Sequence, residues 1–203
     1  MAGYVHHVFV SYRRGGEWEA WVRRFFAPKL RTFLGLHLPG GVSVYLDEQI
    51  DTGAAWQTAL DQAIDSTRIM VPVFMCSFFD SQFCRNELAR MFHREHHLGF
   101  RSDTNAAGLV VPVRLSETEY FPDFVNTIQQ EDLTHFAIPN LAPATPTHES
   151  FDLAMKTFAL KVATAIRRVP SYDPEWARLD GTPYRARLMP KSLEQEAPPR
   201  WAA

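Results

Sequence analysis

The sequence predicts an α/β fold in which helices flank both faces of a parallel sheet. Four short runs rich in β-branched residues predict strands, and three of them are almost continuously apolar, as strands covered on both faces are. The runs are VHHVFVS (5–11), VSVYLD (42–47), IMVPVFM (69–75) and LVVPVRL (109–115). Segments with helical spacing separate them, and such alternation forms parallel sheets through right-handed crossovers. Pro72 and Pro112 must lie where a strand needs no hydrogen-bond donor.

Two amphipathic helices are predicted in the first two gaps between strands. The first repeats apolar residues at Trp18, Trp21, Val22 and Phe25, and Pro28 should end or kink it because proline has no N–H. The second has apolar residues at i, i+3, i+4, i+7 and i+8, with Asp51 or Thr52 as its cap. Its apolar positions are Trp56, Ala59, Leu60, Ala63 and Ile64.

The third gap predicts a helix that is capped by Asp80 or Ser81 and has Glu87 on its buried face. The apolar residues of that face are Phe83, Cys84, Leu88, Met91 and Phe92. An acid here has two interpretations. It interacts with the helix dipole, worth about 0.3 to 1 kcal/mol, or it is a functional group, since glutamate is rarely buried unless it is paired or used.

A final helix is predicted over 150–169, and the region 116–149 should hold at most short elements. Its inward residues are Phe151, Met155, Phe158, Val162 and Ile166. We therefore expect one domain over 1–169 and a proline-rich tail over 170–203 that either packs as extended chain or is mobile. Residues 171–203 should be dispensable for chemistry, although the tail aromatics Trp176, Tyr184 and Trp201 argue for docking.

The composition is that of an ordinary globular protein. Of the 203 residues, 46% are hydrophobic and 22% are charged, and a net charge of -2 gives no general attraction to nucleic acid or acidic membranes. Cys76 and Cys84 form no CxxC pair, which fits a reducing compartment. No signal peptide or apolar stretch of roughly 20 residues is present. We expect a soluble cytoplasmic protein with no membrane partner and no direct nucleic-acid partner.

Ligands of parallel α/β sheets bind outside the carboxyl ends of the strands, which selects the residues after each strand. These are Ser11 to Arg14 after the first, Asp47 onward after the second, and Cys76 to Phe79 after the third, leading to Glu87. Arg13 and Arg14 either bind a phosphate or are solvated, and Tyr12 and Phe79 either stack on a ring or belong to the core. Neither GxGxxG nor GxxxxGK[ST] is present.

No metal site is expected. His93 and His97 are spaced i, i+4, but HREHH is not HExxH and no further ligand is obvious. Cys84 is typical of a small buried residue rather than a nucleophile.

Taken together, these segments resemble the TIR (Toll/interleukin-1 receptor) domain family over roughly residues 5–168. HVFVSYRR resembles its first strand and following loop, VYLDEQIDTGAAW its second strand and BB loop, and QTALDQAIDSTRIMVPVFMCSFFDSQFCRNEL its second helix, third strand and third helix. The resemblance implies a flavodoxin-like parallel sheet flanked by helices on both faces. Phe83 stands where tryptophan is usual, and Thr52-Gly53 stands where many members have Pro-Gly.

Many TIR domains are NAD+ glycohydrolases, and their catalytic glutamate falls in the S-x-x-C-x-x-E pattern formed here by Ser81, Cys84 and Glu87. The resemblance implies that NAD+ is a substrate, not a cofactor, and that Glu87 is catalytic. Nicotinamide leaves as a neutral pyridine, so one carboxylate can suffice, whereas glycoside cleavage normally needs two. We predict substrate contacts from Ser11, Tyr12, Arg13, Asp47, Trp56, Ser77, Phe79, Ser81 and Cys84.

Two functions remain open at this point. The first is an NAD+-consuming enzyme of bacterial defence or signalling, giving ADP-ribose or a cyclic variant, activated by self-association and acting with a possible partner defence protein. The second is a non-enzymatic TIR adaptor that binds other TIR domains. Assembly is expected through the BB-loop residues Glu48, Gln49, Ile50, Asp51, Thr52 and Gly53. A third class, the flavodoxin-like receiver or nucleotide binder, would require an acidic phosphoacceptor pocket or a phosphate-binding loop, and Asp47 alone is too little evidence for either.

Overall fold

The computed structural model describes residues 3–46 and 56–191, except for the side chains at 56 and 57. Within these ranges it forms a five-stranded, fully parallel sheet in the order β2-β1-β3-β4-β5. The strands are β1 (His6–Ser11), β2 (Val44–Leu46), β3 (Thr67–Phe74), β4 (Val113–Arg114) and β5 (Glu131–Asp132). This is the flavodoxin-like order, in which the chain reverses direction across the sheet between β1 and β3.

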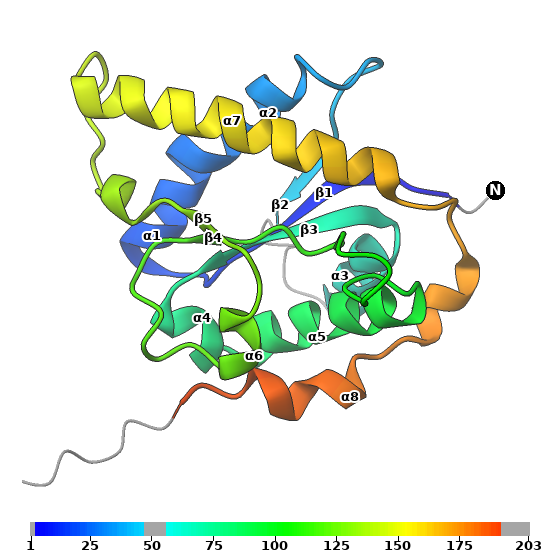
Figure 1. Cartoon of the computed structure of the whole chain (residues 1–203). Coiled ribbons are helices and arrows are strands. Elements are labelled where there is room, and N and C mark those ends of the chain that lie inside the picture. Colours follow the sequence, from blue (N-terminus) through cyan, green and yellow to red (C-terminus); the bar gives the residue numbers. More distant parts are fainter. Residues whose placement is uncertain (1–2, 47–55, 192–203) are drawn as a thin grey trace, which may run out of the picture.

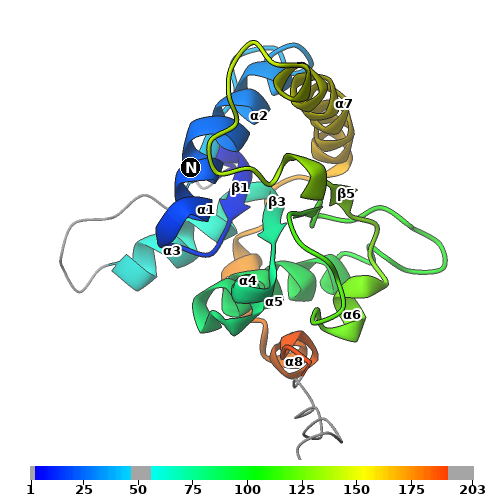
Figure 2. The same ribbon diagram turned by 90° about the vertical axis from the view of Figure 1, so that its left-hand side faces the viewer.

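Helices cover both faces of this sheet, as the sequence predicts (Figure 1). On one face lie α1 (Gly16–Trp21), the π-helical turn η1 (Val22–Phe26), α2 (Ala27–Leu34) and α7 (Pro146–Arg168). On the other lie α3 (Trp56–Asp65), α4 (Cys76–Asp80), α5 (Gln82–His97) and α6 (Asp123–Asn126). Figure 2, turned by 90°, shows the same two layers on either side of the strands.

The helical run from Gly16 to Leu34 does not end at Pro28. The π-helical turn η1 comes directly before Ala27 and Pro28, where the hydrogen-bond register changes. A proline has no N–H and its ring crowds the carbonyl four residues earlier, so a register change at this point lets the helix continue. The predicted inward residues Trp21 and Val22 are fully buried.

Helix α7 covers the same face and packs against α2 (Figure 1). All five of its predicted inward residues are buried, and the Phe158 and Phe26 rings lie 6.2 Å apart. The helix begins at Pro146, four residues before the predicted start, because Thr145 caps it by accepting from His148 N at 3.2 Å. Within the described ranges, no helix is both long and apolar enough to cross a membrane.

Pro72 lies in the central strand β3, at a break in its pairing with β4. Met70 pairs with Val110, and the ladder resumes at Val73 and Val113, so Pro72 and Pro112 occupy the interval between. No donor is needed there, as expected. The strand β4 is consequently much shorter than the predicted run 109–115.

Residues 170–191 do not form the extended or mobile tail that the sequence suggests. They contain η3 (Pro174–Arg178), α8 (Thr182–Arg185) and η4 (Ala186–Leu188), and Trp176 and Leu188 are buried. Helix α8 packs against the outer side of α5 (Figure 2). The expected extended conformation was wrong, whereas the docking that the tail aromatics argue for is confirmed for Trp176 and Tyr184. Isolated aromatic anchors, rather than periodic apolar residues, attach this segment.

Candidate active site

Helix α5 places Glu87 at the carboxyl edge of the sheet. Ser81 is its N-cap, with extended backbone angles, and the Ser81 hydroxyl accepts from Cys84 N at 3.4 Å. Ser81 was one of two predicted caps. Glu87 lies on the inward face of this helix with 6% of its surface exposed, so its carboxylate is buried rather than a solvated partner of the helix dipole.

The Glu87 carboxylate is held by Ser11. Ser11 Oγ donates to Glu87 Oε2 at 2.5 Å, and both side chains are buried. Ser11 is the last residue of β1 and lies opposite Pro72 of β3, at the point where the strand order reverses. A hydroxyl donor to a carboxylate forms a short, charge-assisted hydrogen bond that fixes the orientation of the acid. The two groups thus form a fixed acidic centre at the ligand-binding edge of this fold.

A pocket of about 230 Å³ opens beside this acid. Two chain segments line it, the loop after β1 and the first turns of α5, and Cys84 Sγ joins them by donating to Tyr12 O at 3.4 Å. Ligand pockets usually measure about 300 to 1,000 Å³, so the pocket formed by the described residues is smaller than a usual ligand site. The lining residues are Tyr12, Arg13, Arg14, Ser81, Phe83, Cys84 and Glu87.

The pocket is lined by one acid and two arginines. Glu87 is buried, Arg13 is exposed, and Arg14 is half-buried with its Nη2 shielded from solvent. A carboxylate can stabilise a nearby cationic group, and guanidinium groups bind phosphates in bidentate fashion. The lining therefore offers both an acid that can face a cationic group and guanidinium groups that can bind a phosphate.

Comparison with known families decides the assignment of the chain. A family model described as TIR domain matches residues 8–142, which is most of the chain. The chain belongs to the TIR domain family. Comparison with curated proteins finds no match.

Two solved structures are similar to this TIR domain. The TIR domain of the Toll-related receptor TRR-2 from Hydra magnipapillata has 18% sequence identity and a TM-score of 0.45, covering 64% of this chain and 86% of that one. The TIR domains of the activated Roq1 resistosome recognising the effector XopQ have 20% identity and a TM-score of 0.39, covering 80% and 96%.

Not every predicted substrate contact of the TIR domain lines the pocket. Phe79 belongs to the core, where its ring lies 5.1 Å from that of Phe74 and 4.9 Å from that of Phe121. Ser77 is a half-buried residue of α4, a short helix that the sequence did not predict, and it is outside the lining. Asp47 and the BB-loop residues 48–53 lie outside the described residues, as does the side chain of Trp56.

Phe83 corrects a sequence prediction. It was placed on the buried face of α5, yet half of its surface is exposed, because it lies at the margin of the apolar stripe formed by Cys84, Leu88 and Met91. Its ring instead lines the pocket. A helical wheel drawn with a narrower apolar stripe would have placed Phe83 at the edge of that stripe.

In the part of the chain that the structure describes, no group of three or more His, Cys, Asp or Glu side chains is arranged to hold a metal ion. His93 has a structural contact, since its Nδ1 accepts from Gly181 N at 3.3 Å. The acidic neighbour Glu95 accepts from Val110 N at 2.6 Å and from Arg101 Nε at 2.7 Å, and burial raises the pKa of its carboxyl.

Proposed function

We propose that this TIR domain cleaves the bond between nicotinamide and ribose in NAD+. The main support is the buried Glu87 carboxylate, oriented by Ser11 and open to a pocket that carries two arginines. In this proposal Arg13 and Arg14 bind the pyrophosphate, while Glu87 faces the ribose that carries the cationic nicotinamide. The enzyme acts in the cytoplasm and is activated by self-association.

The reaction breaks the C1′–N bond, and the bonding electron pair leaves with the nicotinamide nitrogen, which becomes neutral. No proton has to be supplied to this leaving group, so Glu87 can remain ionised throughout. Its negative charge stabilises the positive charge that develops on the ribose, as a preorganised charge does in other enzymes. Attack by water then gives ADP-ribose and a proton, whereas attack by a nucleophile of the same molecule gives a cyclic product.

The second candidate is a TIR adaptor without enzymatic activity. The small volume of the pocket favours it, because about 230 Å³ is below the usual size of a ligand site. An adaptor would use Glu87 only as a structural acid. The two candidates therefore differ in what removal of this charge does.

The deciding experiment is the substitution Glu87→Gln, with nicotinamide release from NAD+ measured at high protein concentration to allow assembly. We expect turnover to fall by about 10² to 10³, since the amide keeps the shape and loses the charge. Glu95→Gln is the matched control, because it neutralises another buried acid of the same helix outside the pocket. It should lower stability and leave turnover in place. Equal turnover of Glu87→Gln and wild type would refute the catalytic assignment, and no turnover from either would favour the adaptor.

A further inference from the structure

Residues 170–191, called the C-terminal clasp below, run along the side of α5 that faces away from the sheet (Figures 1 and 2). The clasp lies beyond residue 142, where the match to the TIR family model ends. It contacts the body of the domain at three places: at the N-terminal segment, at the middle of α5 and at α6.

The first contact is an aromatic cluster at the start of the clasp. The Trp176 ring lies 5.6 Å from that of Tyr4, and the Arg94 guanidinium lies 5.0 Å from the Trp176 ring. Tyr4 Oη also donates to Pro170 O at 3.0 Å. Burial raises the pKa of Tyr4 to about 12, which extends the pH range over which the phenol can donate this hydrogen bond. This cluster anchors the clasp to the N-terminal segment of the chain.

The second contact is a close approach of backbone to backbone. Gly181 has a φ of +80°, and a Cβ added to it would lie 2.6 Å from Arg90 N and 2.7 Å from Ala89 C. Gly181 N donates to His93 Nδ1. A side chain at this position would displace the clasp from α5, because both opposing atoms belong to the helix backbone. Only glycine fits here.

The third contact lies around α6. Tyr184 packs with Phe124 at 5.8 Å between ring centroids, and the Arg187 guanidinium lies 3.9 Å from the Phe124 ring. Leu188 is fully buried, and Lys191 Nζ forms an ion pair with Asp123 at 2.8 Å. The clasp is thus attached at both ends, with Gly181 between them.

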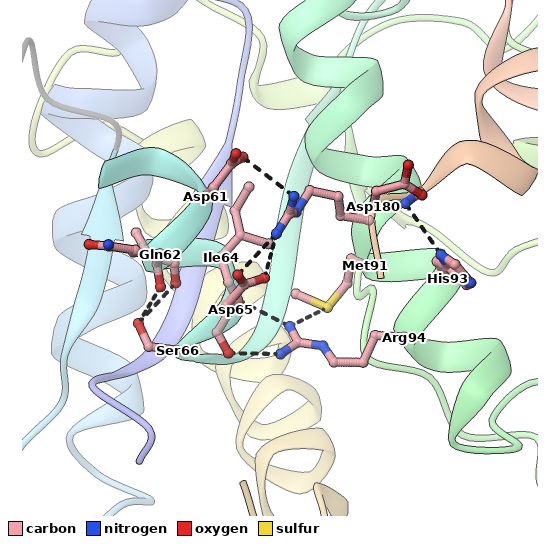
Figure 3. A network of polar contacts seen from close by, with 12 residues as sticks. Asp61, Gln62, Ile64, Asp65, Ser66, Met91, His93, Arg94 and Asp180 are labelled. Carbon is pink, nitrogen blue, oxygen red and sulfur yellow. Dashed lines mark hydrogen bonds and ion pairs between the residues drawn. The ribbon is translucent and has the colours of Figure 1, made fainter. Parts of the chain in front are cut away.

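The same helix is tied to α3 by two arginines (Figure 3). Arg90 Nη2 forms an ion pair with Asp65 at 2.8 Å, and both side chains are largely shielded from solvent. Arg94 donates to the carbonyls of Ile64 and Asp65 at 3.2 Å each, and Figure 3 shows its guanidinium between the end of α3 and Met91. The helix α5 is therefore held from two sides, by α3 and by the clasp.

We infer that the C-terminal clasp is a positioning element for catalysis, which holds α5 in the place where Glu87 meets Ser11. The clasp touches Ala89 and Arg90, two and three residues after Glu87, from the side of α5 opposite the pocket. A shift of this helix moves the carboxylate and breaks its 2.5 Å hydrogen bond. The inference rests on the proposed NAD+ cleavage, and it runs against the expectation that residues 171–203 are dispensable.

The test compares Gly181→Ala with Gly40→Ala. Gly40 has a φ of +86° and nothing within 4 Å of an added Cβ. Gly40→Ala therefore has the same cost of placing alanine at a positive φ, without a clash against α5. In Gly181→Ala we expect faster tryptic cleavage after Arg178 and Arg185, and faster hydrogen exchange over residues 85–92. The kcat for NAD+ cleavage should fall by about 10- to 100-fold with KM within about twofold, as misplacement of a reacting group by about 1 Å does. Gly40→Ala should match wild type in all of these.

Rapid tryptic release of the clasp with unchanged kcat would overturn the inference, and so would unchanged cleavage and exchange in Gly181→Ala. If that variant does not fold, Tyr184→Ala, which removes a half-buried ring at the third contact, is measured in the same way. Hydrogen exchange over residues 85–92 separates this inference from the proposed function. Failure of wild type to cleave NAD+ would refute the function, while the exchange data would still decide whether the clasp holds α5.

Discussion

Removing the Ser11 hydroxyl tests whether the contact with Glu87 matters for both stability and chemistry. Ser11 is 1% exposed, and its hydroxyl donates to a buried carboxylate at 2.5 Å. Hydrogen bonds to charged groups contribute about 1.5 to 3 kcal/mol, and a loss in this range lowers the melting temperature of a chain of this size by about 3 to 12 °C. If the same energy orients Glu87 in the transition state, Ser11→Ala slows turnover by about 13- to 160-fold.

Thermal unfolding and nicotinamide release measured on the same preparations would check both numbers. Thr67→Ala is the control, because the buried Thr67 hydroxyl donates to Ala63 O at 2.7 Å at the start of β3, outside the pocket; it should lower the melting temperature and leave turnover unchanged. Normal melting and normal turnover in Ser11→Ala would refute the reasoning. A lower melting temperature with full turnover would limit Ser11 to a structural role.

Two further changes test the fold. Thr145→Ala removes the cap of α7 that accepts from His148 N, and should cost about 1 kcal/mol, read as a lower midpoint in urea; an unchanged midpoint would contradict the capping role. Burial, followed by the charge of Arg68, lowers the pKa of His7, whose Nδ1 accepts from Ser43 N at 3.1 Å. At His7 the folded state therefore binds fewer protons than the unfolded state. The contribution of neutral His7 to the free energy of unfolding is present above about pH 6.5, the ordinary pKa of histidine, and is lost as the pH falls through and below that value. Urea unfolding at pH 7.5 and 5.5 should show a smaller loss for His7→Gln than for wild type, and equal losses would exclude His7 as the cause.

The strands β1 and β3 could be predicted from the sequence because they are almost continuously apolar and buried, and the helices α3, α5 and α7 because their buried residues recur at helical spacing. The inward side chains of α7, such as Met155 and Val162, repeat every three or four residues. The strand β5 could not be predicted. It consists of Glu131 and Asp132, two charged residues at the edge of the sheet, which give no apolar signal.

The candidate site likewise has features that the sequence could predict and features that it could not. Ser81 and Glu87 share one helix, so spacing and capping could place them together. The contact between Ser11 and Glu87 joins residues 76 positions apart, and the strand-end rule predicts only their general proximity. Which of the nearby aromatics lines the pocket depends on packing, and here Phe83 does so whereas Phe79 is part of the core.

The packing of α7 on α2 has a consequence for synthesis of the protein. The Phe26 ring of the first helical run is covered by Phe158, which is 132 positions later in the chain (158 − 26). At about 5 to 20 residues per second, the ribosome needs roughly 7 to 26 seconds to make the intervening segment. During that interval the apolar side of the first helical run lacks its final covering. The nascent chain therefore exposes this surface to chaperones and to neighbouring nascent chains until almost the whole domain has been made.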